Sequence, residues 1–179
     1  MLPKRLARKV IYTSPWISLY TDRVLMPSGA IIEEYHQLDH PHESVVVLLQ
    51  NRNNKICFIQ SLRYTTQKIE WELPSGGIEN GEDVLFAAER EVIEETGLKA
   101  ISLKHVYTFN PSNGMSNQKA HIVFGEVEDE IQSDYDTDEV SSIHWFTKER
   151  VQDLLQKNAI ADGMSLLPLL LYLSGILSA

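Results

Sequence analysis

The strongest chemical signal in this sequence is a cluster of three glutamates, Glu91, Glu94 and Glu95. In a helix, residues three and four positions apart share a face, so the carboxylates of Glu91 and Glu95 would project together with Glu94 close by. Like charges at this spacing repel one another unless a cation compensates, and hard oxygen ligands suit Mg²⁺ or Mn²⁺. The cluster therefore indicates a divalent-metal site, with a solvated acidic face, partly neutralised by Arg90, as the alternative.

A helix from Glu82 to Thr96 is expected to position these carboxylates. Its apolar residues recur at helical spacing, at Val84, Leu85, Ala88 and Val92. Gly97 follows the last turn and is suited to end the helix in a left-handed cap. The glutamates then lie near the helix C-terminus, where the helix dipole disfavours negative charge. Helix stability alone does not account for them, which favours a role in chemistry.

The segment from Gly76 to Leu98 reads GGIENGEDVLFAAEREVIEETGL. It matches the Nudix box, G-x5-E-x7-R-E-U-x-E-E-x-G-U with U a bulky apolar residue, at every specified position. The chain therefore resembles the Nudix hydrolase family, whose members are divalent-metal enzymes. The resemblance implies an α+β protein, the Nudix α/β/α sandwich with a mixed sheet, in which the box forms a loop, a helix and a second loop.

The same resemblance implies a set of metal ligands. Glu91 and Glu95 would be the principal ligands of Mg²⁺, with Mn²⁺ as an alternative metal, and Glu94 would add a direct or water-bridged contact that serves catalysis. The backbone carbonyl of Ser75 would also face the metal. Glu82 would contribute an outer contact.

Two glycines and an arginine complete the expected surroundings of the metal. Gly76 and Gly77 would let the backbone bend tightly, so that the Ser75 carbonyl faces the metal and the backbone approaches the substrate; an ordinary turn is the alternative. Arg90 would orient the glutamates by ion pairing rather than touch the substrate.

Residues 9–160 further resemble the ADP-ribose pyrophosphatase and nucleoside-diphosphate-sugar hydrolase branch of the family. The features, in order, are Pro27-Ser28-Gly29, His40-Pro41, Ser61-Leu62-Arg63-Tyr64 and Trp71-Glu72-Leu73-Pro74-Ser75-Gly76. By this resemblance Arg63 contacts a substrate phosphate, with an exposed structural arginine as the alternative. Trp71 could stack on the nucleobase, although aromatic residues at such positions more often pack against the core.

The resemblance implies hydrolysis of a nucleoside diphosphate sugar to a nucleoside monophosphate and a sugar phosphate. The loop Pro111-Ser112-Asn113-Gly114 departs from the Ser-Pro-Gly that ADP-ribose pyrophosphatases tend to carry in this region. Both ADP-ribose and other nucleotide sugars, such as GDP-mannose, therefore stay open as substrates. A dinucleoside polyphosphate hydrolase and a noncatalytic nucleotide-binding sensor are the alternative functions.

The reaction needs a base that accepts a proton from the attacking water. In the resembled branch this base is usually a glutamate on a loop after the box, and the acidic residues 134–139 lie in such a place. Glu139 is the predicted base, with Asp138 and Asp136 as alternatives. A solvated acidic loop without a catalytic role is the competing interpretation.

Short strands are expected on both sides of the box. They are Lys9–Thr13, Trp16–Tyr20, Arg23–Met26, Ile31–His36, Ser44–Leu49, Ile56–Leu62, Ile101–Phe109, Ala120–Val127 and Ser142–Phe146. The fifth and sixth are expected to form a hairpin in the central sheet. Thr147 is suited to cap a further helix, and a buried terminal helix is expected to begin near Ser165 with Pro168 in its first turn.

The first strands, in residues 1–42, are expected to form an N-terminal antiparallel strand arm, with a turn at Pro27-Ser28-Gly29. Residues 43–179 would form the Nudix hydrolase domain. N-terminal strands commonly reach across a dimer in the resembled branch, so the resemblance implies a homodimer.

Composition narrows the classes of partner. The chain has 179 residues and a net charge of −9, which argues against nonspecific binding to nucleic acid or to an anionic membrane. The single cysteine, Cys57, lies in a strand-like run and is expected in the core; it excludes an intramolecular disulfide. The apolar stretch Leu166–Leu177 is too short to span a membrane. The expected location is the cytoplasm.

Overall fold

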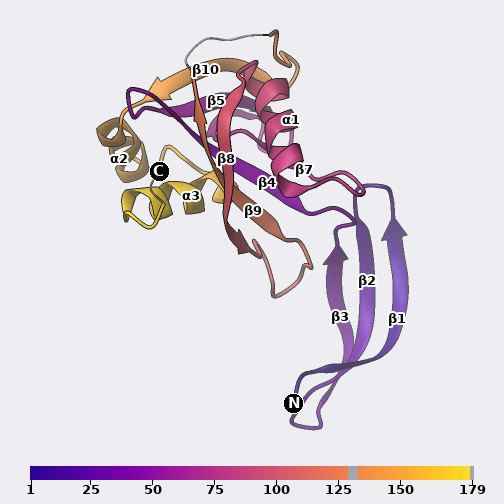
Figure 1. Ribbon diagram of the computed structural model, residues 1–179. Coiled ribbons are helices and arrows are strands. Elements are labelled where there is room, and N and C mark those ends of the chain that lie inside the picture. Colours follow the sequence, from indigo (N-terminus) through magenta and orange to yellow (C-terminus); the bar gives the residue numbers. More distant parts are fainter. Residues whose placement is uncertain (129–132, 178–179) are drawn as a thin grey trace. The chain divides into compact units, whose positions relative to one another are not determined.

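The computed structural model describes residues 1–128 and 133–177, which form two compact units (Figure 1). The first unit comprises residues 1–43 and 110–119. The second comprises residues 44–109 and the described part of the chain from residue 120 onward.

The first unit is a three-stranded antiparallel sheet in the order β1 (Lys4–Thr13), β2 (Ser18–Leu25) and β3 (Ile31–Asp39). The turn predicted at Pro27-Ser28-Gly29 is confirmed, because the Met26 amide donates to the Ala30 carbonyl at 2.8 Å and Gly29 has a φ of 88°.

The prediction of two strands at Trp16–Tyr20 and Arg23–Met26 is wrong, since the single strand β2 runs through both. Asp22, which lies between the two predicted strands, is only 4% exposed. Its carboxylate accepts hydrogen bonds from Nε and Nη2 of Arg8 on β1, at 2.8 and 2.7 Å. A charged residue is tolerated inside the sheet because its charge is paired there.

The second unit contains a mixed sheet in the order β10-β5-β4-β9-β8, with β6 paired to β5 and β7 to β4. The strands are β4 (Ser44–Asn51), β5 (Ile56–Arg63), β6 (Lys68–Glu72), β7 (Ser75–Gly77), β8 (Ala100–Phe109), β9 (Ala120–Val127) and β10 (Val140–Phe146). The central pair β4 and β9 is parallel, and the other pairs are antiparallel.

The predicted hairpin of β4 and β5 is confirmed, but the two strands pair only at Gln50 and Ile56. Beyond that point β5 pairs with β6, which was not predicted, and β4 pairs with β7. The two strands therefore separate, and residues 68–77 run between them. This separation brings the start of the Nudix-box segment, Gly76, next to Val45 of β4.

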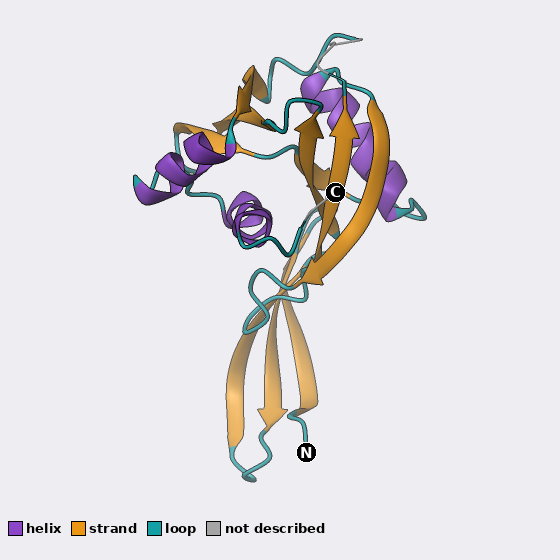
Figure 2. Cartoon of the chain, turned by 60° about the vertical axis from the view of Figure 1, so that its left-hand side comes forward, coloured by secondary structure: helices purple, strands orange, loops and turns teal. Residues whose placement is uncertain are grey.

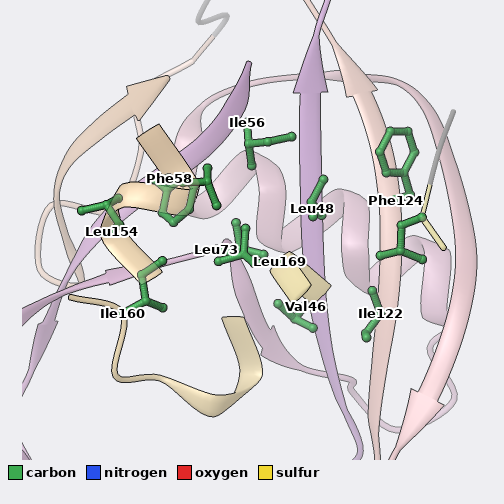
Figure 3. Close-up of a cluster of buried hydrophobic side chains, with 12 residues drawn as sticks. Val46, Leu48, Ile56, Phe58, Leu73, Ile122, Phe124, Leu154, Ile160 and Leu169 are labelled. Atoms are coloured by element: carbon green, nitrogen blue, oxygen red, sulfur yellow. The ribbon is translucent and has the colours of Figure 1, made fainter. Parts of the chain in front are cut away.

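Three helices cover the sheet: α1 (Val84–Thr96) on one face, and α2 (Lys148–Gln156) and α3 (Gly163–Leu173) on the other (Figure 2). Alternate residues of β4 enter two separate cores, because neighbouring side chains of a strand point to opposite faces. Val45 and Val47 join the core under α1. Val46 and Leu48 join the core under α2 and α3, which is drawn in Figure 3. The predicted α/β/α sandwich with a mixed sheet is confirmed.

The helix ends differ from the predictions in two places. Helix α1 begins at Val84 after an Asp83 cap, two residues later than expected. Helix α3 begins at Gly163 after an Asp162 cap, so Pro168 lies in its second turn and not in its first. The Asp162 side chain accepts from the Met164 and Ser165 amides, which fixes this earlier start.

Other local predictions are confirmed. Gly97 ends α1 with a φ of 64°, and Thr147 caps α2 by accepting from the Arg150 amide. Cys57 is buried in the core. Within residues 1–128 and 133–177, no helix has both the length and the apolar character needed to cross a membrane.

Candidate active site

Helix α1 presents two buried carboxylates toward the sheet. Glu91 is 8% exposed and Glu95 is 5% exposed, whereas Glu94, between them, is exposed. They share the inner face of the helix with Ala88 and Val92, which are fully buried in the core. Packing of that apolar stripe therefore forces Glu91 and Glu95 inward, as their spacing predicted.

The carboxylate of Glu91 lies directly against Gly76 of β7. A Cβ atom on Gly76 would stand 2.1 Å from Cδ and from Oε1 of Glu91, far inside van der Waals contact. Gly76 and Gly77 are part of a strand, and neither has a positive φ. The predicted tight bend at these glycines is therefore wrong, and Gly76 instead provides space for the Glu91 carboxylate.

Glu95 is held by the backbone of the same strand. The Ser75 amide donates to Oε2 of Glu95 at 2.7 Å. Burial raises the pKa of Glu95 to about 8; the charges of Glu91 and Glu139 add to this rise, while the Ser75 amide and Arg63 oppose it. Burial also raises the pKa of Glu91, partly offset by Arg90. Both carboxylates are thus held where a positive charge would stabilise their ionised forms.

Arg90 forms hydrogen bonds with three acidic residues of the box. Its guanidinium donates to Glu82 at 3.0 Å from both Nε and Nη2, and to the Gly77 carbonyl at 2.7 Å. Its Nη1 donates to Glu91 at 2.7 Å and to Glu94 at 3.1 Å. Hydrogen bonds with Glu82 are the largest cause of the raised pKa of Arg90, and the same pair lowers the pKa of Glu82. One guanidinium therefore ties the loop before α1 to the helix.

The loop that carries Glu139 docks on the C-terminal end of α1. The Asp136 amide donates to the Glu94 carbonyl at 2.7 Å, and the Ser133 amide donates to the Gly97 carbonyl at 3.2 Å. Glu139 is exposed, and its charge contributes to the raised pKa of both Glu91 and Glu95. The structure thus places Glu139 where its charge acts on the two buried carboxylates.

Asp136, one of the alternatives to Glu139, has a structural role in this loop. Its Oδ1 accepts from the Asp138 amide at 2.8 Å, and its carbonyl accepts from the Val140 amide at 3.0 Å. Asp138, the other alternative, is exposed. Glu139, unlike the two aspartates, is among the main causes of the raised pKa of Glu91 and Glu95.

Arg63, at the end of β5, forms a bidentate ion pair with Glu72 of β6. Nε donates to one carboxylate oxygen at 2.8 Å and Nη2 donates to the other. The Glu72 side chain is 3% exposed, whereas the Arg63 side chain is 40% exposed. The pair raises the pKa of Arg63, and the charge of Glu95 adds to that rise, so Arg63 lies within electrostatic reach of the buried carboxylates.

Glu72 was not singled out from the sequence. The signal that could have identified it is the position of an acidic residue between the apolar residues Trp71 and Leu73. In the folded sheet this position is buried. The fact that it pairs with an arginine nine residues earlier depends on the pairing of β5 with β6, which the sequence did not predict.

Trp71 packs on the core rather than standing free. Its ring meets His144 at 4.9 Å and Phe146 at 5.1 Å between centroids, in both cases edge-on. It is partly buried beside the cluster shown in Figure 3. These contacts favour the packing alternative.

Most of the predicted site residues therefore converge on one region of the second unit. Those brought together are Arg63, Ser75, Gly76, Gly77, Glu82, Arg90, Glu91, Glu94, Glu95 and Glu139. Across the described part of the chain, no three His, Cys, Asp or Glu side chains are arranged so that they could jointly hold a metal ion. Instead, the positive charge of Arg90 is paired with the carboxylates of Glu82, Glu91 and Glu94.

Comparison with known proteins gives two family matches. The NUDIX domain profile matches residues 40–167, and the profile of the nucleoside diphosphate sugar hydrolase N-terminal domain matches residues 3–38. A CMP-5'-(N-acetyl-N-hydroxy-3-aminopropyl)phosphonate hydrolase of Streptomyces rubellomurinus is 26% identical over 83% of this chain and 71% of its own length. An ADP-ribose pyrophosphatase of Bacillus subtilis is 27% identical over 89% of this chain and 86% of its own length.

The fold is also that of a solved structure. A crystal structure of an ADP compounds hydrolase superposes with a TM-score of 0.85, covering 98% of this chain and 96% of that chain at 19% identity. At such low identity the likeness concerns the fold alone. With the NUDIX domain matching residues 40–167 and the sandwich confirmed, the chain belongs to the Nudix family.

Proposed function

We propose that the protein is a metal-dependent hydrolase of nucleoside diphosphate sugars, of the ADP-ribose or GDP-mannose type. It would cleave the diphosphate linkage to give a nucleoside monophosphate and a sugar phosphate. The observation that carries the proposal is the pair of buried carboxylates, Glu91 and Glu95, held against Gly76 and Ser75 with Glu139 and Arg63 in electrostatic reach. The match of residues 3–38 to a nucleoside diphosphate sugar hydrolase domain supports this substrate class.

The donor set fits a hard divalent cation. Glu91 and Glu95 are carboxylates whose burial is only partly compensated, and such oxygen ligands suit Mg²⁺, our proposed metal, or Mn²⁺. Glu91, Glu95 and the carbonyl of Ser75 would hold it, and the more exposed Glu94 would join them by turning away from Arg90, because the three carboxylates are not arranged around one point in this structure. When bound, the cation supplies neutralisation of the charge on the phosphoryl oxygens and promotes ionisation of water.

The protein's own groups would divide the remaining work. Arg63 would donate to a phosphate of the substrate. Glu139, exposed beside the two carboxylates, would accept the proton of the attacking water. Arg90 would keep Glu91 and Glu94 oriented through its hydrogen bonds to both. The backbone of Gly76 and Gly77 would lie close to the substrate, since both lack a side chain.

The decisive experiment is a hydrolysis screen with ADP-ribose, GDP-mannose, UDP-glucose and diadenosine polyphosphates, in Mg²⁺, in Mn²⁺ and in a chelator. Glu95→Gln is the test variant, and Glu89→Gln, on the same helix at a position that the box leaves unspecified, is the matched control. Turnover of a nucleotide sugar that the first variant loses and the second retains would support the proposal. Intact folding and tight nucleotide binding without turnover of any compound would instead favour a noncatalytic sensor.

We further propose that the protein is a homodimer built on the first unit. Within that unit, several large apolar side chains of β1 are exposed: Leu6, Val10, Ile11 and Tyr12, by 42–57%. A three-stranded sheet needs an apolar face packed on something to be stable, and exposed apolar patches of this kind mark contact surfaces. Light scattering after gel filtration would test it, with Val10→Asp expected to give monomers and Ile101→Asp, also 56% exposed, to leave dimers.

The proposed partners are the small substrate and a second copy of the chain; the net charge of −9 disfavours nucleic acid and anionic membranes. A cytoplasmic location completes the proposal, since the single cysteine of the sequence, Cys57, is buried in the core and no intramolecular disulfide can form. Cell fractionation with an antibody to the chain would test the location.

A further inference from the structure

We infer that Glu72 is a positioning residue, which fixes the guanidinium of Arg63 so that its free donors point at the substrate diphosphate. The inference rests on the proposed function and deepens it. It assigns a role to a buried carboxylate that lies outside the Nudix box, in a stretch that carries the branch resemblance but in which Glu72 was given no role.

The first argument is the geometry of the pair. A guanidinium has five N–H donors in a planar fork. Nε and one hydrogen of Nη2 are engaged by the two oxygens of Glu72, so the plane and the rotation of the group are fixed. The other three hydrogens, on Nη1 and Nη2, point away from Glu72. That second edge is the one a phosphate can accept from in a bidentate manner.

The second argument is the difference in exposure between the partners. The Glu72 side chain is 3% exposed and the Arg63 side chain is 40% exposed. A pair made only for stability has no need of a buried carboxylate, because burial of a charge is costly even when it is paired. Here Glu72 is buried in the sheet, whereas Arg63 remains accessible to a ligand. This is the arrangement expected if Glu72 holds Arg63 in position for binding.

The third argument is the environment of the pair on the sheet. Glu72 is opposite Ile59 in the β5–β6 register, so Glu72, Ser61 and Arg63 lie on the same face as the core under α1. The hydroxyl of Ser61 is buried and, among the described residues, is the only such side-chain atom without a hydrogen-bond partner. A polar atom left in this state beside the pair marks a place where a polar ligand, or water that it displaces, belongs.

The change in substrate affinity when Glu72 loses its charge distinguishes two explanations for the role of Arg63. If Arg63 acted as a simple positive charge, removing the negative charge of Glu72 would strengthen binding of a diphosphate. If Arg63 acts as an oriented donor, removing Glu72 frees the guanidinium to rotate and binding weakens despite the more favourable net charge. The two explanations therefore predict opposite changes for the same variant.

The test is Glu72→Gln, assayed with ADP-ribose and Mg²⁺ and by calorimetry with methylene-bridged ADP-ribose, which resists hydrolysis. We expect KM and the Kd of the analogue to rise about tenfold or more, with kcat changed by less than about threefold. Arg63→Lys, which keeps the charge but loses the fork, should give a similar rise. The double variant should be no worse than Arg63→Lys alone, because the two residues act through one contact.

Glu128→Gln is the matched control, because it removes the same charge from the exposed pair of Arg52 and Glu128. Its KM and Kd should equal those of the wild type. Thermal melting shows whether each variant is folded, and Glu72→Asp, which keeps the charge on a shorter side chain, replaces Glu72→Gln if the latter does not fold. We expect its KM to lie between those of the wild type and Arg63→Lys.

An unchanged or lower KM in a folded Glu72 variant would overturn the inference while leaving the proposed function intact. A double variant much weaker than Arg63→Lys would overturn it as well, since Glu72 would then act independently of Arg63. A wild-type protein that neither hydrolyses ADP-ribose nor binds the analogue would overturn the proposed function, and the inference with it.

Discussion

The carboxylate of Glu91 occupies the space that a side chain at Gly76 would need, with 2.1 Å between its Cδ and the position of a Cβ. The obstacle is the far end of a flexible side chain, so a small residue at position 76 would displace the carboxylate rather than break the fold. We expect Gly76→Ala to fold with stability within about 1 kcal/mol of the wild type. Turnover should fall about 100-fold or more, because a misplaced ligand lowers catalysis strongly. Steady-state kinetics and urea unfolding measure the two effects.

Gly163→Ala is the control for this variant. Gly163 is the first residue of α3, and a Cβ there would meet nothing within 4 Å. Alanine should leave turnover unchanged. Full activity in Gly76→Ala would mean that the position of the Glu91 carboxylate does not matter for the reaction.

Replacing Glu95 with glutamine should separate stability from function. The carboxylate is 5% exposed and accepts a hydrogen bond from the Ser75 amide, which the oxygen of a glutamine side chain can also accept. Burial raises the pKa of Glu95 to about 8, so at pH 7 the metal-free wild type must take up a proton at this group when it folds. Glutamine avoids this cost and should therefore stabilise the metal-free protein by about 1–3 kcal/mol. Differential scanning calorimetry in a chelator should show a higher Tm for Glu95→Gln.

Added Mg²⁺ should then raise the Tm of the wild type more than that of Glu95→Gln, because a ligand stabilises the state that binds it. If Glu95→Gln melts below the wild type in a chelator, the Ser75 amide and Arg63 stabilise the Glu95 carboxylate by more than its burial costs. If Mg²⁺ raised the Tm of both proteins equally, Glu95 would not be a ligand of the metal.

The proposed base can be tested with two neighbouring acidic residues. Glu139 and Asp138 are both exposed, but Glu139 is the one of the two among the main causes of the raised pKa of Glu91 and Glu95. Glu139→Gln should lower kcat by about 10²–10⁴, the range typical of a lost general base. Asp138→Asn should change kcat by less than about threefold. A loss of similar size in both variants would contradict the assignment of the base to Glu139.

The pair of Arg8 and Asp22 predicts a pH dependence of stability in the first unit. The hydrogen bonds from Arg8 lower the pKa of Asp22, whereas burial opposes the shift. A carboxyl group with a lowered folded-state pKa contributes stability above its unfolded pKa of about 4, and this stability is lost as the pH falls through the folded value. Asp22→Asn should therefore cost about 1–3 kcal/mol at pH 7, the range for hydrogen bonds to charged groups.

Hydrogen exchange of β1, β2 and β3 as a function of pH would measure this effect. The difference between the wild type and Asp22→Asn should shrink as the pH falls below about 4, because the wild-type pair is lost by protonation. A difference that stays constant down to pH 2 would mean that the charge of Asp22 does not stabilise the sheet.

The elements with strong periodicity could be predicted from the sequence. The helix that carries Glu91 and Glu95, its Gly97 cap and the apolar strands β4 and β9 all carry their signal within a few residues. The inward direction of the two glutamates also follows from the spacing alone. These predictions succeed because the interactions concerned are local in the chain.

The features that the sequence did not predict depend on partners far along the chain. Strand β6 is short and mostly polar, and it is a strand because β5 separates from β4 and pairs with it. Strand β2 continues through Asp22 because Arg8 lies opposite. Gly76 was expected to bend the chain, but its role is to leave room for a carboxylate from another element. None of these partners can be identified without the register of the sheet.

The docking of the Glu139 loop on α1 has a consequence for how the molecule opens. The amides of Ser133 and Asp136 satisfy carbonyls in the last turn of the helix that bears Glu91 and Glu95. The proposed base and the proposed metal ligands are thus linked through backbone hydrogen bonds, and we expect fraying of residues 133–139 to loosen the helix end as well. A fluctuation that removes the base would loosen the carboxylates at the same moment. The protein would then pass between a fully assembled and a fully disassembled site, without a half-built form able to bind metal but not to activate water.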